Sequence, residues 1–290
     1  MATVSPTAPT RGAAKMEIRP VGNSFAAEIV GLDLREPLDA DTQARIDAAF
    51  VEHHVLAFRD QSLEKRDQLA VTLKFGELDV HAAMNAGDDV PEVHVVSNLN
   101  EAGLPDPDRL GSQHWHSDKS YRRVPSTATF LYGIEVPAIG GDTCFADTAT
   151  ALEALPKAQR DYVSSLRVVH CWERSVAKGG GRISAAERRL YPPIAHPLAR
   201  LQPSGRRALF IGQHASHIAG IPMAEGVALL DELQTHATRD EFVYEHDWRP
   251  GDLLIWDNRG LVHRALNNFA TDRERRILHR TVTRGTEVPC

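Results

Sequence analysis

Short apolar runs separated by Gly, Pro, Asp and Asn dominate the chain, and their length is typical of β-strands. Such runs lie at 16–21, 25–34, 55–60, 93–98, 127–136, 143–147, 165–172, 207–213, 241–248, 252–258 and 276–285. Helical spacing of apolar residues predicts helices at 42–53, 62–76, 149–166 and 223–239. In the first helix Ile46, Ala49 and Phe50 share one face, and Asp39 or Asp41 can cap its start. The pattern favours a mixed α/β, mainly β fold, either a β-sandwich or a jelly roll with helices packed outside.

Two segments interrupt this pattern, and neither has the composition of an interdomain linker. Residues 1–15 are rich in Ala, Thr and Pro and are expected to form a disordered tail. Residues 173–193 contain three consecutive glycines and many charges, and we interpret them as a mobile loop or lid. No repeat with a fixed period is present, so the rest is expected to form a single domain.

Composition narrows the class of protein. The net charge is -6 and no segment is strongly basic, so nucleic acid is not expected as the main partner. No apolar run approaches the roughly 20 residues that span a bilayer, and the N-terminus lacks the apolar core of a secretory signal. Three scattered cysteines are too few for a disulfide framework or a zinc ribbon, so a cytoplasmic location is expected.

The run His-Trp-His-Ser-Asp at 114–118 is the first candidate for chemistry. In an extended strand His116 and Asp118 point to the same face, while Ser117 points away. A histidine and a carboxylate are two ligands of the 2-His-1-carboxylate triad that suits non-haem Fe(II). The triplet alone also fits a structural His–Asp hydrogen bond, and His114 competes with His116 at a poorer spacing from the aspartate.

A third ligand must come from elsewhere in the chain. His263 is the best candidate because it lies just beyond the apolar strand 252–258, where the chain turns back over the sheet. The remaining histidines, including His214 and His217, are expected to form hydrogen bonds in the core or in loops.

Two arginines in the last strand form a second candidate site. Arg276 and Arg280 share one face with Leu278, and an inward-facing arginine needs an anion. The planar guanidinium suits a carboxylate, as an iron oxygenase with a 2-oxoacid cosubstrate requires. Thr143, which opens a strand after Gly140 and Gly141, is the candidate hydroxyl donor. The other arginine would bind an acidic substrate.

Four motifs, in order, carry a family resemblance: Trp-His-Ser-Asp at 115–118, and the segments 140–147, 256–265 and 275–285. They resemble the taurine dioxygenase / 2,4-dichlorophenoxyacetate dioxygenase family of Fe(II)- and 2-oxoglutarate-dependent oxygenases. The resemblance extends over 16–285 and is closer to the phenoxyacetate branch at 210–226 and 236–259. It implies a double-stranded β-helix (jelly-roll) core and a homo-oligomer, either a dimer or a tetramer.

The resemblance also implies a role for each matching residue. The iron ligands fall on His116, Asp118 and His263. The 2-oxoglutarate contacts fall on Thr143, Arg276 and Trp256. The contacts to the substrate anion fall on Arg280 and His81.

The implied activity is hydroxylation of a small anionic substrate at Fe(II), with 2-oxoglutarate and O2 as cosubstrates and with release of succinate and CO2. An aryloxyacetate would be cleaved to a phenol and glyoxylate. Taurine, another sulfonate or an alkyl sulfate is the alternative substrate class. A zinc-dependent jelly-roll hydrolase or isomerase, and a non-catalytic binding module, are more remote alternatives. The zinc enzyme would not need Thr143 and Arg276 as a clamp, and the binding module would not need an intact triad.

Overall fold

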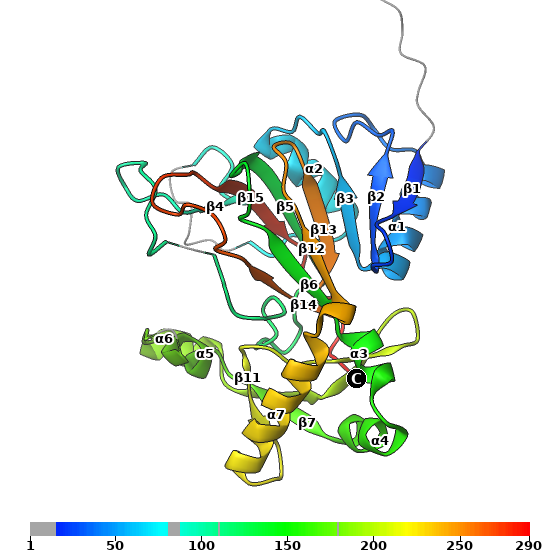
Figure 1. Cartoon of the computed structure of the whole chain (residues 1–290), viewed down its shortest axis with the longest axis vertical. Helices are drawn as coiled ribbons and strands as arrows, with labels where there is room; N and C mark the ends of the chain where they lie inside the picture. Colours follow the sequence, from blue (N-terminus) through cyan, green and yellow to red (C-terminus); the bar gives the residue numbers. More distant parts are fainter. Residues whose placement is uncertain (1–15, 81–87, 110, 179) are drawn as a thin grey trace, which may run out of the picture.

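A seven-stranded sheet forms the upper part of the molecule in Figure 1. The computed structural model describes residues 16–80, 88–109, 111–178 and 180–290. The strand order is β1 (Glu17–Pro20), β2 (Ala26–Val30), β3 (Val55–Phe58), β13 (Leu253–Asp257), β5 (Ala128–Glu135), β15 (Ile277–Val282) and β4 (His94–Ser97). Neighbouring strands are antiparallel except β2 and β3, which are joined by a helical crossover as a parallel pair requires.

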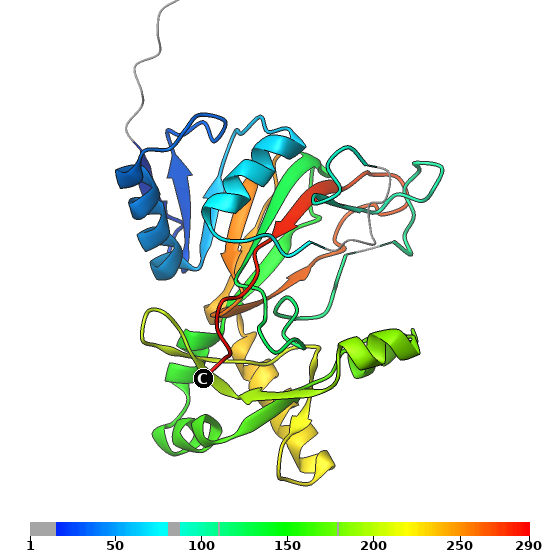
Figure 2. The same ribbon diagram turned by 180° about the vertical axis from the view of Figure 1, so that it is seen from behind.

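Two helices cover one face of this sheet, as Figure 2 shows from behind. The crossover helix α1 (Ala40–His53) begins at Asp39, whose side chain accepts a hydrogen bond from the Thr42 amide. Its buried residues are Ile46, Ala49 and Phe50, so the predicted apolar face is confirmed. Helix α2 (Lys65–Lys74) packs against β15. The covered face is therefore closed to solvent, and the opposite face is left to carry the site.

A smaller sheet faces that opposite side. Its antiparallel strands are β12 (Val243–His246), β6 (Thr143–Asp147) and β14 (Leu261–Ala265). Phe145 of β6 packs with Trp256 of β13 and Leu278 of β15 in one buried cluster. Two sheets thus share an apolar interior, and the candidate site residues lie at its edge.

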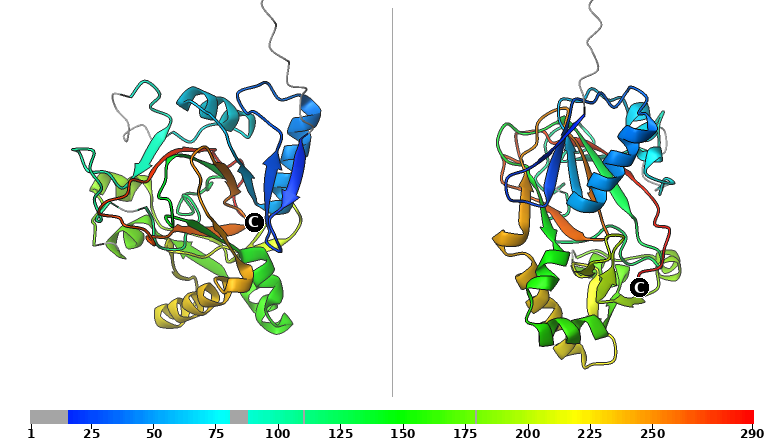
Figure 3. Two further views of the ribbon diagram at one scale, coloured as in Figure 1. Left: turned by 45° about the horizontal axis from the view of Figure 1, so that its top comes forward. Right: turned by 90° about the vertical axis from the view of Figure 1, so that its right-hand side faces the viewer.

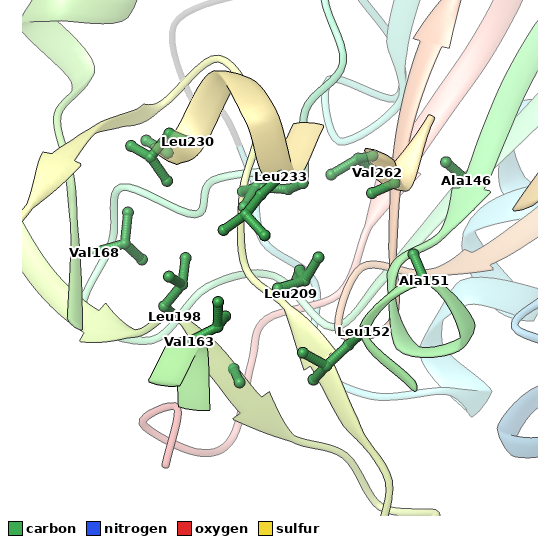
Figure 4. Packing of buried hydrophobic residues seen from close by; sticks show 14 of the residues in the cluster. Ala146, Ala151, Leu152, Val163, Val168, Leu198, Leu209, Leu230, Leu233 and Val262 are labelled. Carbon is green, nitrogen blue, oxygen red and sulfur yellow. The ribbon is translucent and has the colours of Figure 1, made fainter. Parts of the chain in front are cut away.

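The remaining elements form the lower part of the molecule and have their own core. They are β7 (Arg167–His170), β8 (Ile194–Pro197), β9 (Ala199–Leu201), β10 (Arg207–Leu209), β11 (Ala215–Ile218), α3 (Thr148–Ala154), α4 (Lys157–Ser165), α5 (Trp172–Lys178), α6 (Ala185–Leu190), α7 (Met223–Ala237) and the 3-10 helix η1 (Asp240–Phe242). Leu230 and Leu233 of α7 point toward Leu209 and Leu198 in Figure 4. In both views of Figure 3, α7 and α4 lie at the end of the molecule away from α1.

The structure differs from the sequence expectations in three places. The single helix expected over 149–166 is two helices, because Pro156 lacks the amide proton that an uninterrupted helix needs there. The segment 173–193, expected to be a loop or lid, contains most of α5 and all of α6, and Ser184 and Glu187 form a capping box at the start of α6. Strands β8, β9 and β11 were not predicted, since they are short and β8 ends in Pro197.

Among the described residues, no helix is both long enough and apolar enough to cross a membrane.

Candidate active site

His116 and His263 are brought together by a one-residue β-bridge. The His116 amide donates to the His263 carbonyl at 3.0 Å, and the His263 amide donates back at 2.8 Å. His263 lies on β14, whose partner β6 fixes its position in the smaller sheet. The two imidazole rings lie 4.1 Å apart between centroids. The fold therefore joins two histidines that are far apart in sequence.

Asp118 completes the candidate ligand set, but not through the predicted strand geometry. Only His116 is in a bridge, and Asp118 lies in a turn that continues into Lys119 with φ 53°. One ligand atom from each of His116, Asp118 and His263 lies within 4.8 Å of the other two. Asp118 Oδ1 is 3.7 Å from His116 Nε2, and Asp118 Oδ2 is 3.9 Å from His263 Nε2. Two bonds of roughly 2.0–2.2 Å to one divalent ion span such separations.

Gly212 allows the neighbouring chain to approach this turn. Its φ is 108°, and a Cβ there would lie 2.9 Å from the Trp115 carbonyl oxygen and 3.0 Å from His116 Cα. The next residue, Gln213, donates its amide to the Trp115 carbonyl at 2.8 Å. A side chain at 212 would therefore push His116 out of position.

The Asp118 carboxylate is buried and well supplied with partners. Burial disfavours its ionised form, but the Arg280 guanidinium, with Nη2 at 2.7 Å, and the two histidines hold its pKa well below the usual range. Thr129 donates to Oδ2 at 2.6 Å, and Asn258 donates in turn to Thr129 at 2.9 Å. The carboxylate is thus ionised and fixed in orientation, as a metal ligand must be.

The histidines are neutral and suitably oriented. Burial lowers the pKa of His116 and holds that of His263 well below its ordinary value. His116 Nδ1 is 2.9 Å from the His114 carbonyl oxygen, which can only accept, so the proton is on Nδ1 and Nε2 is free for a metal. His114 thus supports the ligand through its backbone. Two neutral imidazoles and one carboxylate fit a divalent iron ion.

Arg276 occupies a second buried position beside Thr143. Its Nε donates to the Gly141 carbonyl at 2.7 Å, and its Nη2 lies 3.4 Å from Thr143 Oγ1. Burial lowers the pKa of Arg276 to about 10, which still leaves it charged at neutral pH. Gly140 permits this turn because its φ is 80° and a Cβ there would lie 2.2 Å from the Asn268 carbonyl oxygen.

No carboxylate lies within ion-pair distance of Arg276 in the part of the chain that the structure describes. The arginine lines a small pocket together with Val96, Asn98, Leu266 and Phe269. A buried cation that faces a pocket requires an anion from outside, so the distal carboxylate of 2-oxoglutarate fits this position.

Trp256 and His81 complete the predicted set. Trp256 is buried against His263, with 4.7 Å between ring centroids, and its indole N–H donates to Asn258 at 3.2 Å. It does not line the pocket beside Arg276. His81 lies outside the described residues.

Comparison with known proteins adds independent evidence. Residues 17–282 match the model of the "Taurine catabolism dioxygenase TauD, TfdA family". The chain belongs to this family. It is 38% identical over 259 residues to the alpha-ketoglutarate-dependent 2,4-dichlorophenoxyacetate dioxygenase of Cupriavidus pinatubonensis, covering 85% of this chain and 90% of the relative. It is 34% identical to the alpha-ketoglutarate-dependent sulfate ester dioxygenase of Pseudomonas putida, covering 96% and 92%.

A solved structure of AAD-2 in complex with Mn(II) and N-oxalylglycine superimposes with a TM-score of 0.83 at 31% identity. The match covers 96% of this chain and 100% of AAD-2. This TauD/TfdA family member is therefore an oxidoreductase, a dioxygenase that depends on Fe(II) and 2-oxoglutarate. The dioxygenase relatives favour this class over the zinc enzyme or binding module that the triad alone allowed.

The sequence did not reveal an aromatic group beside the candidate metal ligands. The His214 ring lies 6.4 Å from that of His116, and the Tyr121 ring lies 4.9 Å beyond it. Trp172 and Tyr191 extend the group at 4.7 and 5.2 Å from Tyr121. His214 Nδ1 is buried without a hydrogen-bond partner, so the expectation of a bonded histidine was wrong at this atom, whereas His217 Nδ1 bonds to Ser216 at 2.7 Å.

Proposed function

We propose that the enzyme hydroxylates an aryloxyacetate and cleaves it to a phenol and glyoxylate. The aromatic group of Tyr121, Trp172, Tyr191 and His214 beside the metal ligands is the observation that carries this proposal. Aromatic side chains pack favourably against an aromatic ring, and a taurine molecule offers no such ring. The phenoxyacetate relative at 38% identity supports the same substrate class.

His116, Asp118 and His263 would hold the iron ion, since their ligand atoms converge and carry suitable protonation states. With iron and 2-oxoglutarate bound, the site would supply oxygen chemistry in which one atom of O2 enters a substrate C–H bond and the other enters 2-oxoglutarate, which leaves as succinate and CO2. Thr129 and Asn258 keep the Asp118 carboxylate in a fixed orientation during this chemistry.

The two arginines would divide the two anions between them. Arg276 binds the distal carboxylate of 2-oxoglutarate, and the Thr143 hydroxyl donates a hydrogen bond to the same carboxylate. Arg280 lies next to Asp118 and has 22% of its side chain exposed, so it is placed to bind the substrate carboxylate near the iron. Hydroxylation at the carbon beside the ether oxygen gives a hemiacetal, which breaks down to the phenol and glyoxylate.

Further features remain part of the proposal. Residues 16–285 would form one catalytic domain. The seven-stranded sheet and the sheet of β12, β6 and β14 would form its double-stranded β-helix (jelly-roll) core. Segment 173–193 would cover the substrate as a lid, because Tyr191 within it and Trp172 directly before it belong to the aromatic group. We also propose a cytoplasmic homo-oligomer, with His81 near the substrate anion.

Substrate-dependent succinate formation tests the proposal. The panel contains 2,4-dichlorophenoxyacetate, phenoxyacetate, taurine and an alkyl sulfate, each with Fe(II) and 2-oxoglutarate. We expect the highest kcat/KM with an aryloxyacetate and release of the matching phenol. Faster turnover of taurine or the alkyl sulfate than of both aryloxyacetates would contradict the substrate assignment.

Arg280→Gln tests the division between the arginines. The KM for the aryloxyacetate should rise roughly 10- to 100-fold, as expected when a charge-assisted hydrogen bond is lost, while the KM for 2-oxoglutarate changes little. The opposite pattern would mean that the two arginine roles are exchanged.

A further inference from the structure

His94 lies directly opposite Arg280 in the large sheet. It is the first residue of the edge strand β4, and the antiparallel register pairs it with Arg280 of β15. Residues directly opposite each other in such a pair project from the same face, with Cβ atoms roughly 5 Å apart. His94 therefore shares the inner face of the sheet with the proposed substrate arginine.

The imidazole of His94 lacks a hydrogen-bond partner within the part of the chain that the structure describes. Its Nδ1 is buried without a hydrogen bond, and no hydrogen bond or ion pair to its side chain is found among the described residues. Burial, and then the charge of Arg280, lower the pKa of His94, so the ring is neutral and keeps one N–H to donate. A buried polar atom without a partner is unfavourable unless a ligand satisfies it.

The neighbours of His94 on the same face have other functions. Val96, two residues along β4, packs against the apolar core between the sheets. The Asn98 side chain accepts a hydrogen bond from the Arg276 backbone amide at 2.8 Å, and so positions the arginine that would bind 2-oxoglutarate. A purely structural role at 94 would be filled by an apolar side chain such as that of Val96, yet the residue is a histidine beside a cation.

Arg280 itself leaves room for a second donor. Its Nη2 is already 2.7 Å from Asp118 Oδ1, so one corner of the guanidinium serves the metal ligand and not the substrate. We propose that His94 is a substrate-binding residue that donates a hydrogen bond to the anionic group held by Arg280. This assignment rests on the proposed function, in which a small organic anion lies beside Arg280.

His94→Ala, His94→Asn and His279→Ala test the assignment. His279 is a matched control because it adjoins Arg280 in sequence, has an equally unpartnered Nδ1, and lies on the opposite face of the sheet near Lys65 and Asp88. We expect His94→Ala to raise the KM for 2,4-dichlorophenoxyacetate roughly tenfold, as for one lost hydrogen bond to a charged group. His94→Asn, which retains a donor, should recover part of this loss, and His279→Ala should leave KM unchanged.

Calorimetric titration of the Fe(II)- and 2-oxoglutarate-loaded enzyme under nitrogen gives a readout independent of turnover. The ligands are 2,4-dichlorophenoxyacetate and 2-(2,4-dichlorophenoxy)ethanol, which lacks the carboxylate. His94→Ala should weaken binding of the acid about tenfold and leave binding of the alcohol unchanged. Equal weakening of both ligands, or no weakening of the acid, would overturn the assignment.

The two proposals can fail separately. If the wild type prefers a sulfonate or sulfate ester, the aryloxyacetate proposal fails, and the same variants are measured with that anion. The His94 assignment then holds if His94→Ala raises the KM of the preferred anion, and fails if only Arg280→Gln does so. If no anion of the panel shows Arg280-dependent binding, both proposals fail.

Discussion

The buried carboxylate of Asp118 is surrounded by partners, whereas the buried guanidinium of Arg276 has no carboxylate within ion-pair distance among the described residues, and Asp142 acts on it only from farther away. Arg280 and Thr129 neutralise and orient Asp118 from within the protein. Around Arg276 the corresponding contacts are the carbonyl of Gly141 and the hydroxyl of Thr143, which neutralise no charge.

This contrast distinguishes a prearranged site from one that requires its ligand. A metal ligand must be ionised and correctly oriented before the ion arrives, and the partners of Asp118 achieve both. A cosubstrate arginine gains by remaining unpaired, because an internal carboxylate would compete with 2-oxoglutarate. In the proposed function, the unfavourable burial of the Arg276 charge is offset by binding of the 2-oxoglutarate carboxylate.

Asp118→Ala should have the largest effect, because it removes the best-supported element of the comparison. We expect loss of tight Fe(II) binding and a fall in succinate formation of at least about 100-fold. Metal content after anaerobic reconstitution and succinate release measure the two effects, with the exposed Asp272→Ala as control. Stoichiometric, tightly bound iron in Asp118→Ala would exclude the assignment of this residue as a ligand.

Arg276→Met and Arg280→Met should change thermal stability in opposite directions. Removing the unpaired Arg276 should raise the Tm of the ligand-free protein by roughly 2–4 °C and abolish stabilisation by 2-oxoglutarate. Removing Arg280 leaves Asp118 buried without its cation and should lower the Tm. Thermal unfolding of both variants is measured with and without 2-oxoglutarate. A lower Tm for Arg276→Met than for the wild type would contradict the view that the Arg276 charge is unpaired and destabilising.

Thr129→Val should have a smaller effect, since it removes one hydrogen bond to Asp118 and keeps the side-chain volume. The affinity for Fe(II) should fall about tenfold, in the range for a lost partner of a metal ligand. Thr281→Val is the matched control, because Thr281 bonds to Thr72 on the face covered by α2. Titration with Fe(II) under nitrogen measures the iron affinity of the two variants. Equal affinities would argue against a role of Thr129 in orienting Asp118.

The smallest expected effect concerns His196. This buried histidine is neutral in the folded protein and forms no ion pair among the described residues. Burial lowers its pKa to about 4. Between roughly pH 6.5 and 4 the unfolded chain binds a proton here that the folded protein does not, so the free energy of unfolding falls as the pH falls. His196→Gln should reduce this slope in denaturant unfolding measured across the window. An unchanged slope would place the acid sensitivity at other histidines.

Elements governed by neighbours in the sequence could be predicted. The apolar face of α1 and its Asp39 cap depend on residues within a few positions, and both were confirmed. The break at Pro156 was a local signal that was overlooked. The short strands β8, β9 and β11 were not predicted, because each has only three or four residues, and β8 and β11 are fixed by pairing with β7, which lies elsewhere in the chain.

The candidate site shows the same division. Its residue types were predicted from motifs, but Thr129, Asn258 and the aromatic group were not, because their contacts join different elements of the fold and follow no spacing in the sequence. The extended geometry assumed for 116–118 was also wrong, since it is a single bridge followed by a turn.

The sequence by itself determined which groups are available: two imidazoles, a carboxylate, a hydroxyl and two arginines in a recognisable order. Only the tertiary structure decided which arginine is paired and which is not, and that His94 lies beside Arg280. The physical reason is that side-chain chemistry is a property of each residue, whereas burial, pairing and register depend on contacts between strands that lie far apart in the chain.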